Sequence, residues 1–305
     1  MASPSVWLIT GASRGLGFEI AKAALQAGHT VVGGRRNSGE DDPRAAELQS
    51  LGGHWINLEM AGEHVEERIA EVAAKYGKID VLVNNAGYGV GGVAEDIGIQ
   101  LYRDIIEVNV IGVIRACQAV TPIMRSQGHG TIVNIGSLSG IIAEPGVNAY
   151  ACSKHALEGV FLFSVLGAIE CAYILCIGFT ESFSKEVSAF NIRTLLVEPG
   201  NIDTDVADVT KTGIEVPRSE PYRGSPADII LNTLTNAELL KSISACPIKS
   251  ALRIVEAVDK TGMFAGRDVK LRLPLGREVQ DILDWGNELV KSTDSLKDIA
   301  NSVYN

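Results

Sequence analysis

The chain has 305 residues, 46% of them hydrophobic and 21% charged, so it can bury a large core and is not disordered throughout. Its 27 basic and 37 acidic residues give a formal net charge of −10, and no Lys/Arg run stands out, so we expect no nucleic-acid partner. The five cysteines are odd in number and form no CxxC pair, which argues against a disulfide scaffold. With no visible secretory signal, this cysteine usage predicts a cytoplasmic protein.

Short apolar runs alternate with helical patterns along the first two thirds of the chain. Strands are predicted at 6–9, 30–32, 79–83, 131–135 and 193–198, and helices at 18–26, 63–75 and 101–120. Continuous apolar strands that alternate with helices predict an α/β fold with a doubly wound parallel sheet. We expect one domain, with a cofactor-binding and catalytic core at 5–205. The pattern loosens after Pro199, so 205–305 is expected to supply a substrate lid and C-terminal helices.

A glycine-rich turn, Thr10-Gly11-Ala12-Ser13-Arg14-Gly15-Leu16-Gly17, follows the first predicted strand and opens the first helix. Its glycines permit a tight turn and a close approach of the backbone to a pyrophosphate. The helix N-terminus adds free N–H groups and a positive dipole end. The alternative is a purely structural turn, but the strand before it and the helix after it favour dinucleotide binding. The predicted contacts are Gly11, Ser13, Arg14, Gly15, Leu16 and Gly17.

Two arginines, Arg35 and Arg36, end the second predicted strand. An acidic residue there would bind the adenine ribose hydroxyls and favour NAD. Guanidinium groups instead suit a 2′-phosphate, and Arg14 in the first turn adds another. The sequence therefore predicts NADP(H), the alternative being a solvated arginine pair on a loop.

Further motifs follow in a fixed order: Asn84-Asn85-Ala86-Gly87, Asn109 in Val-Asn-Val, Ser137 in Asn-Ile-Gly-Ser, Tyr150-Ala-Cys-Ser-Lys154 and Pro199-Gly-Asn-Ile-Asp-Thr204. With the glycine-rich turn, this set resembles the short-chain dehydrogenase/reductase family over most of residues 5–205. The resemblance implies a Rossmann fold. It also implies an NADP(H)-dependent oxidoreductase that interconverts a carbonyl and an alcohol by hydride transfer, with no metal.

Tyr150 and Lys154 are four residues apart, so they share one face of a helix. A tyrosine with a pKa near 10 is a poor base at neutral pH. A neighbouring ammonium, with the oxidised nicotinamide nearby, would lower that pKa. Tyr150 is then the expected acid/base, and Ser137 would hydrogen-bond the substrate oxygen. By resemblance, Lys154 also holds the nicotinamide ribose, and Asn109 holds a water that links Lys154 to solvent. Such a Tyr/Lys pair alone is usually only surface, but the ordered set favours catalysis.

The resemblance implies further cofactor contacts at Asn85 and Gly87, and at Ile202 and Thr204 near the carboxamide. Glu59 stands where the family commonly has Asp near the adenine, so this longer side chain is a departure that puts the contact in doubt. The substrate, its stereochemistry and the direction of the reaction stay open.

Residues 160–178, VFLFSVLGAIECAYILCIG, interrupt the helix that carries Tyr150. Joining Gly159 to Phe179 would give one apolar stripe of Cys152, Ala156, Phe179, Phe183 and Val187 at successive i+4 steps. A continuous helix through the insertion would instead turn Phe179 and Phe183 by roughly 100° away from that core. The insertion must therefore loop out, or the helix register is broken.

Three explanations of 160–178 compete: a translated intron or other gene-prediction error, an apolar excursion for membrane or partner contact, and a buried helix extension. A true transmembrane span from the middle of a catalytic domain is rejected. Family members commonly form dimers or tetramers through the helices that bear Asn109 and Tyr150, so the insertion leaves homo-oligomerisation open. Two other functions compete with the enzyme: a non-catalytic NADP(H)-binding sensor or scaffold, and a membrane-associated lipid or steroid reductase.

Overall fold

The computed structural model describes residues 4–36, 42–158, 178–204, 218–295, 297 and 302. Seven strands form one sheet: β1 (Val6–Ile9), β2 (Thr30–Arg35), β3 (His54–Asn57), β4 (Val81–Asn84), β5 (Gly130–Ile135), β6 (Ile192–Pro199) and β7 (Arg272–Leu275). Their order is β3-β2-β1-β4-β5-β6-β7, and every neighbouring pair is parallel. The predicted doubly wound α/β fold is confirmed. The chain order reverses between β1 and β4, where such sheets bind ligands beyond the carboxyl ends of their strands.

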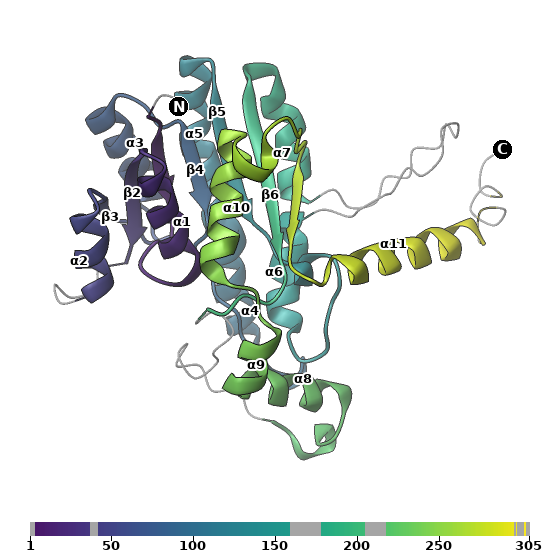
Figure 1. Cartoon of the computed structure of the whole chain (residues 1–305). Helices are drawn as coiled ribbons and strands as arrows, with labels where there is room; N and C mark the ends of the chain where they lie inside the picture. The colour runs from purple at the N-terminus through teal and green to yellow at the C-terminus, as the bar shows by residue number, and fades with distance from the viewer. Residues whose placement is uncertain are drawn as a thin grey trace.

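The helices are α1 (Gly15–Gln26), α2 (Pro43–Ser50), α3 (Val65–Tyr76), α4 (Ile99–Ile106), α5 (Gly112–Gln127), α6 (Asn148–Glu158), α7 (Phe179–Val187), α8 (Pro226–Thr235), α9 (Ala237–Ile243), α10 (Pro247–Asp259) and α11 (Val279–Asp294). Figure 1 shows α1 and α10 on one side of the sheet, α3 and α5 on the other, and α8 and α9 beyond its carboxyl edge.

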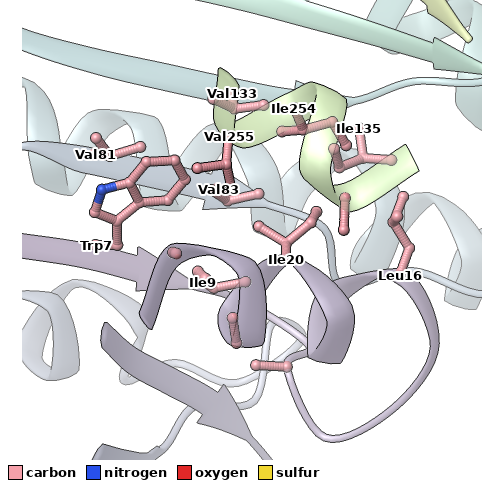
Figure 2. Packing of buried hydrophobic residues seen from close by; sticks show 14 of the residues in the cluster. Trp7, Ile9, Leu16, Ile20, Val81, Val83, Val133, Ile135, Ile254 and Val255 are labelled. Atoms are coloured by element: carbon pink, nitrogen blue, oxygen red, sulfur yellow. The ribbon is translucent and has the colours of Figure 1, made fainter. Parts of the chain in front are cut away.

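Alternate residues of each strand point into two separate cores, as the period of a β-strand requires. Trp7 and Ile9 of β1 pack with Ile20 of α1 and Ile254 of α10 in the first core (Figure 2). Leu8, between them, packs on the other side of the sheet with residues of α3 and α5. Both faces of β1 are therefore covered, which explains why its sequence is apolar throughout.

The structure corrects three sequence predictions. The single helix predicted at 101–120 is α4 and α5 joined by a π-helical turn, Glu107–Ile111. Strand β3 and helix α2 were not predicted. The region expected to supply a lid and C-terminal helices holds α8 to α11 and also contributes β7, which was not predicted and pairs with β6. Its helix α10 packs in the first core. Part of residues 205–305 therefore belongs to the central fold.

The two ends of the interrupted helix meet the same core. Ala156 of α6 packs in the second core, as do Phe179, Phe183 and Val187 of α7. Cys152, expected on the same apolar stripe, is exposed. Residues 159–177, which hold nearly all of the apolar insertion, lie outside the described residues. Helices α6 and α7, on either side of these residues, meet in one core, and the choice between the alternatives stays a prediction.

One helical run of the described chain, Ile99–Gln127, is long and apolar enough to cross a membrane by length and composition. Val113, Ala116 and Val120 on this run pack in the second core against the sheet. Burial of this kind is typical of a core helix and accounts for its apolar character.

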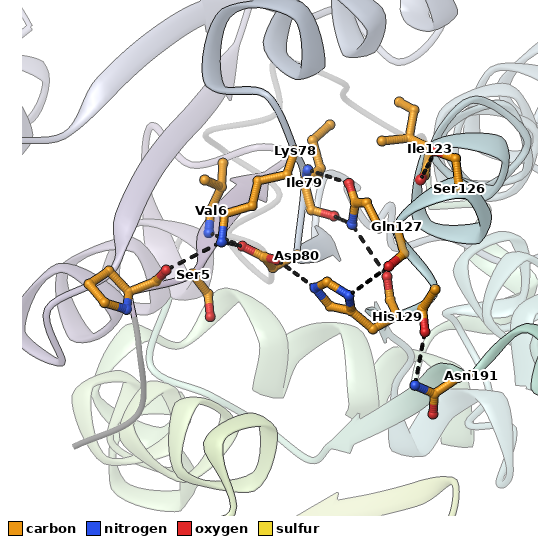
Figure 3. Close-up of polar contacts among 12 residues, drawn as sticks. Ser5, Val6, Lys78, Ile79, Asp80, Ile123, Ser126, Gln127, His129 and Asn191 are labelled. Carbon is orange, nitrogen blue, oxygen red and sulfur yellow. Dashed lines mark hydrogen bonds and ion pairs between the residues drawn. The ribbon is translucent and has the colours of Figure 1, made fainter.

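At the amino edge of the sheet, Asp80 links the starts of three strands (Figure 3). Its carboxylate accepts the N–H of Val6 at 2.7 Å and lies 2.8 Å from Lys78 Nζ and 3.0 Å from His129 Nε2. Burial alone would raise the pKa of Asp80. The hydrogen bonds from Lys78, Val6 and His129 outweigh burial and hold the pKa below its usual value.

Replacing Asp80→Asn is expected to lower the free energy of unfolding by about 2 kcal/mol at pH 7, because charge-assisted hydrogen bonds are lost. Because the pKa of Asp80 is lower in the folded state, its ionised form stabilises the fold at any pH above the unfolded-state pKa of about 3.9. This stabilisation is lost as the pH falls through the folded-state pKa. The difference from wild type should therefore shrink below about pH 4, as measured by urea unfolding. Glu71→Gln removes one partner of an exposed ion pair with Arg68 and is the control. It should change neither the free energy of unfolding at pH 7 nor the pH dependence of that free energy.

Deleting residues 160–178 is expected to leave a folded protein, because both flanking helices already pack in one core. Its melting temperature should lie within about 3 °C of the full chain or above it. Circular dichroism and thermal unfolding measure this. Deleting 179–187, which removes the buried Phe183 and Val187, is the contrasting variant and should abolish cooperative unfolding. Loss of folding in the first deletion would show that the insertion is a structural part of the domain.

Candidate functional site

A cavity of about 350 Å³ opens at the carboxyl edge of the sheet. Its floor consists of the segments that follow β1, β4, β5 and β6, and includes Leu16, Asn85, Gly87, Ser137 and Pro199–Ile202. Tyr150 and Lys154 of α6 line it as well. Its outer wall comes from Ile230 and Leu234 of α8 and Leu240 and Ile243 of α9. The predicted catalytic tyrosine and lysine therefore share one cavity with part of the glycine-rich turn.

The glycine-rich turn leaves no space for side chains where it approaches the segment after β4. Gly11 has a φ of +65°, and a Cβ there would lie 2.8 Å from Ala86 Cα. A Cβ on Gly17 would lie 2.2 Å from Asn85 Nδ2. That amide donates to the carbonyl oxygens of Thr10 and Gly11, at 3.1 Å each. Asn85 thus fixes the turn by hydrogen bonds, and the turn then continues into the N-terminus of α1.

The three arginines predicted to bind a phosphate lie at the same edge. The Ala12 N–H donates to the carbonyl of Gly34 at 3.0 Å, which ties the turn carrying Ser13 and Arg14 to the end of β2. Arg14 and Arg36 are exposed there. Arg35 is half-buried, with its guanidinium carbon 5.0 Å from the centre of the Trp55 ring.

Glu59 follows β3 close to these arginines, because the N–H of Leu58 donates to the carbonyl of Arg35 at 2.8 Å. The Glu59 side chain is exposed and makes no hydrogen bond or ion pair within the described part of the chain. Its position suits the predicted adenine end of the site, but no contact within the described chain directs its carboxylate.

Tyr150, Lys154 and Ser137 converge at the end of β5. Lys154 Nζ donates to the carbonyl of Ile135, the last residue of β5, at 2.8 Å, and lies 5.6 Å from the centre of the Tyr150 ring. Ser137 follows two residues later and is buried. Its Oγ accepts the N–H of Ser139 at 3.1 Å, which fixes the turn that carries it.

The pKa of Tyr150 in the protein alone is raised, whereas the lowering expected from the sequence also involves the oxidised nicotinamide. Burial raises it, and a hydrogen bond with Ser137 only partly opposes burial. Burial also lowers the pKa of Lys154 to about 8, against the pull of the Glu158 carboxyl. At neutral pH Tyr150 is therefore a protonated phenol beside a lysine that is still mostly charged.

Asn109 occupies the π-helical turn between α4 and α5, a feature often found at functional sites. Its Oδ1 accepts the N–H of Tyr88 at 3.1 Å, and its Nδ2 donates to the Tyr88 carbonyl at 2.9 Å and to Ser153 Oγ at 3.0 Å. The side chain thus links the segment after β4 to α6. The described residues show no direct contact between Asn109 and Lys154, and the predicted water relay stays a prediction.

The remaining predicted contacts lie around this centre. Gly87 faces Asn109, whose Oδ1 would be 3.0 Å from an added Cβ. Ile202 and Thr204 follow β6, and Thr204 lies across from Gly15. Ile202 also forms a parallel bridge with Ala245, just after α9, so the outer wall is hydrogen-bonded to the floor.

Three residues at the site were missed. Thr10 Oγ1 accepts the N–H groups of Asn85 and Ala86, both at 3.0 Å. Ser153 binds Asn109 from inside the Tyr150–Lys154 span. Thr10 is the first residue of the glycine-rich turn and Ser153 lies between Tyr150 and Lys154. Their places in these motifs could have indicated that they belong to the site. Glu278 lines the cavity from the residue before α11, and nothing in the sequence pattern around it indicates this.

Comparison with known proteins agrees with this geometry. The model of the short chain dehydrogenase family matches residues 5–164. The oxidoreductase claN of Passalora fulva is 40% identical over 230 residues, which are 74% of this chain and 93% of that protein.

Two solved structures are also similar. A short-chain dehydrogenase from Streptomyces avermitilis superposes with a TM-score of 0.75 at 29% identity, covering 99% of this chain and 98% of the other. An actinorhodin polyketide ketoreductase, solved with NADPH, gives a TM-score of 0.69 at 26% identity, covering 94% and 100%. The likeness to both extends over nearly the whole chain.

Proposed function

Because the chain belongs to the short-chain dehydrogenase family, we propose that it is an NADP(H)-dependent oxidoreductase that interconverts a carbonyl and an alcohol. One observation carries this proposal: Tyr150, Lys154 and Ser137 line the same cavity as the segments after β1, β4 and β6. Hydride transfer to a carbonyl needs a proton donor and a nicotinamide side by side, and this cavity offers a place for both. A non-catalytic sensor would need the residues that bind the cofactor but would not need Tyr150, Lys154 and Ser137 beside them.

A nicotinamide cofactor fits the glycine-rich turn, because the turn leads into the N-terminus of α1, whose free N–H groups and positive dipole end suit a pyrophosphate. One similar structure, the actinorhodin polyketide ketoreductase, was solved with NADPH. The choice of NADP(H) is supported by Arg14, Arg35 and Arg36, because guanidinium groups bind a phosphate by charge-assisted hydrogen bonds. When bound, the cofactor supplies the hydride.

In the proposed reduction, Tyr150 donates its phenolic proton to the substrate oxygen. Its raised pKa keeps that proton in place at neutral pH. The Ser137 hydroxyl binds the same oxygen and stabilises the charge that develops on it. Lys154, held by the Ile135 carbonyl, places its positive charge beside the ring and so favours loss of the proton when the carbonyl accepts hydride. In the oxidation direction Tyr150 receives the proton.

Helices α8 and α9 contribute apolar side chains to the cavity lining: Ile230, Leu234, Leu240 and Ile243. Polar side chains line it as well, among them Thr233, Glu278 and Asp281. Burying apolar surface there would stabilise binding by about 25 cal/mol per Å² of area removed from water. We therefore place the substrate among small carbonyl compounds with an apolar body. We also propose a cytoplasmic location, which the free thiols of Cys117, Cys152 and Cys246 support.

Tyr150→Phe is expected to lower kcat for ketone reduction by at least about 100-fold, because general-acid catalysis contributes that much or more. NADPH binding, followed by fluorescence, should stay within about twofold, since the ring is retained. Tyr76→Phe is the control: Tyr76, at the end of α3, is absent from the described cavity lining, and its hydroxyl has no hydrogen-bond partner in the described chain, so this variant should keep wild-type turnover. Wild-type kcat in Tyr150→Phe would refute the acid/base assignment.

Arg36→Ala is expected to raise the Kd for NADPH by roughly 10- to 100-fold, because a charge-assisted hydrogen bond to phosphate contributes about 1.5–3 kcal/mol. NADH affinity should not change. Arg68→Ala, on the exposed face of α3, controls for the loss of a positive charge. Equal effects on NADPH and NADH would contradict a 2′-phosphate contact.

A further inference from the structure

Behind the catalytic pair, two carboxyl groups and a guanidinium are buried together. Glu158 ends α6 with its side chain fully buried, and Glu198 of β6 is 3% exposed. Arg272 of β7 reaches both: its Nη1 lies 2.8 Å from Glu198 Oε1 and also bonds Glu158 Oε1. Its Nη2 donates to the main-chain oxygen of Glu158 at 3.2 Å. The Glu158 carboxyl is therefore held in place from outside its own helix.

This cluster lies directly beneath the catalytic groups. Glu158 follows Lys154 by one helical turn, so both side chains lie on the same face of α6. A Cβ on Gly136 would come within 2.8 Å of Glu158 Oε2. Gly136 stands between Ile135, whose carbonyl accepts the Lys154 ammonium, and Ser137. Within the described chain, Oε2 finds no N–H or O–H donor, so no hydrogen bond offsets the burial of this oxygen.

The charges in the cluster depend on one another. Burial lowers the pKa of Lys154, and the Glu158 carboxyl opposes this. Burial and the neighbouring Glu198 raise the pKa of Glu158, while Arg272 and Lys154 oppose them. The cluster therefore holds a proton on Glu158 that can be lost as the pH rises. Once Glu158 is ionised, its negative charge favours the ammonium form of Lys154.

We propose that Glu158, fixed by Arg272, is a positioning residue that extends to higher pH the range over which Lys154 stays charged against the Ile135 carbonyl. The proposal rests on the proposed function, in which the charge of Lys154 assists proton transfer by Tyr150. The charged or titratable groups that face this pair are Tyr150 on α6, Glu198 on β6, Arg272 on β7 and Glu181 on α7. Glu181 Oε2 also reaches Arg272, at 3.4 Å, but is partly exposed.

The test compares Glu158→Gln with wild type from pH 6 to 10. Glutamine keeps the size of the side chain but cannot become negative, so Lys154 should lose its proton at a lower pH. We expect kcat/KM for ketone reduction to be within about twofold of wild type at pH 6.5 and about tenfold lower at pH 9, as a shift of one pKa unit gives. The pH dependence of NADPH affinity, measured by fluorescence, should show the same shift without turnover.

Glu181→Gln is the matched control, because it removes a carboxylate that contacts Arg272 but not the carboxyl beneath Lys154. The fall of its kcat/KM at alkaline pH, the alkaline limb of the pH profile, should coincide with that of wild type. Glu158→Asp, which retains a more distant carboxyl, should lie between wild type and Glu158→Gln. The proposal fails if Glu158→Gln leaves the alkaline limb at the same pH or moves it to higher pH. It also fails if Glu181→Gln moves the alkaline limb to lower pH as far as Glu158→Gln does.

If Glu158→Gln does not fold, Glu158→Asp decides, and an unshifted limb then overturns the proposal. If no ketone is reduced by wild type, the proposed function fails instead. The NADPH-binding profile would still test the role of Glu158 in that case.

Discussion

The hydrogen bond between the Lys154 ammonium and the carbonyl of Ile135 is the interaction on which the site depends. It places a buried positive charge at the carboxyl end of β5, at 2.8 Å. Burying an ammonium is costly unless it is hydrogen-bonded and compensated by negative charge. The Ile135 carbonyl supplies the hydrogen bond. The carboxyl of Glu158 lies one helical turn further along α6 and supplies negative charge once it loses its proton. Because Lys154 is fixed, the Tyr150 ring one turn earlier faces Ser137 and the cavity.

The parallel sheet explains why these groups meet. In such a sheet the carboxyl ends of all strands lie at one edge, so the segments after β1, β4, β5 and β6 converge although they are far apart in sequence. Side-chain hydrogen bonds then join the segments to one another. Thr10 and Asn85 connect the first two, and Asn109 connects the segment after β4 to α6 through Tyr88 and Ser153. These bonds hold the floor of the cavity in a fixed shape.

Much of the fold could be predicted from the sequence because buried parallel strands are apolar throughout. The runs at 6–9 and 131–135 are of this kind and agree within one residue with β1 and β5. β3 and β7 lie at the two edges of the sheet, where strands are less buried. The sequences His54–Asn57 and Arg272–Leu275 mix polar with apolar residues, so their period does not reveal a strand. The π-helical turn could not be predicted either, because Glu107–Ile111 continues a helical pattern.

The same reasoning applies to the site. Tyr150, Lys154, Ser137 and Asn109 stand in motifs that resemble those of the family, so the amino-acid sequence is sufficient to name them as candidates. The direction of the Tyr150 pKa cannot be identified in this way, because burial depends on the walls that distant segments place around the ring. Arg272 has no sequence signal either: it acts on Glu158 across 114 positions of sequence, a contact that only the pairing of β6 with β7 creates.

The central claim is that this cavity transfers hydride from a nicotinamide to an apolar carbonyl compound. The most direct test uses NADPH deuterated at C4 on either face, in separate reactions of the wild-type protein with a panel of apolar ketones. We predict that one of the two labelled cofactors places deuterium on the carbinol carbon of the product, detected by mass spectrometry. NADPH binding without deuterium in any product, from either label, would contradict the claim.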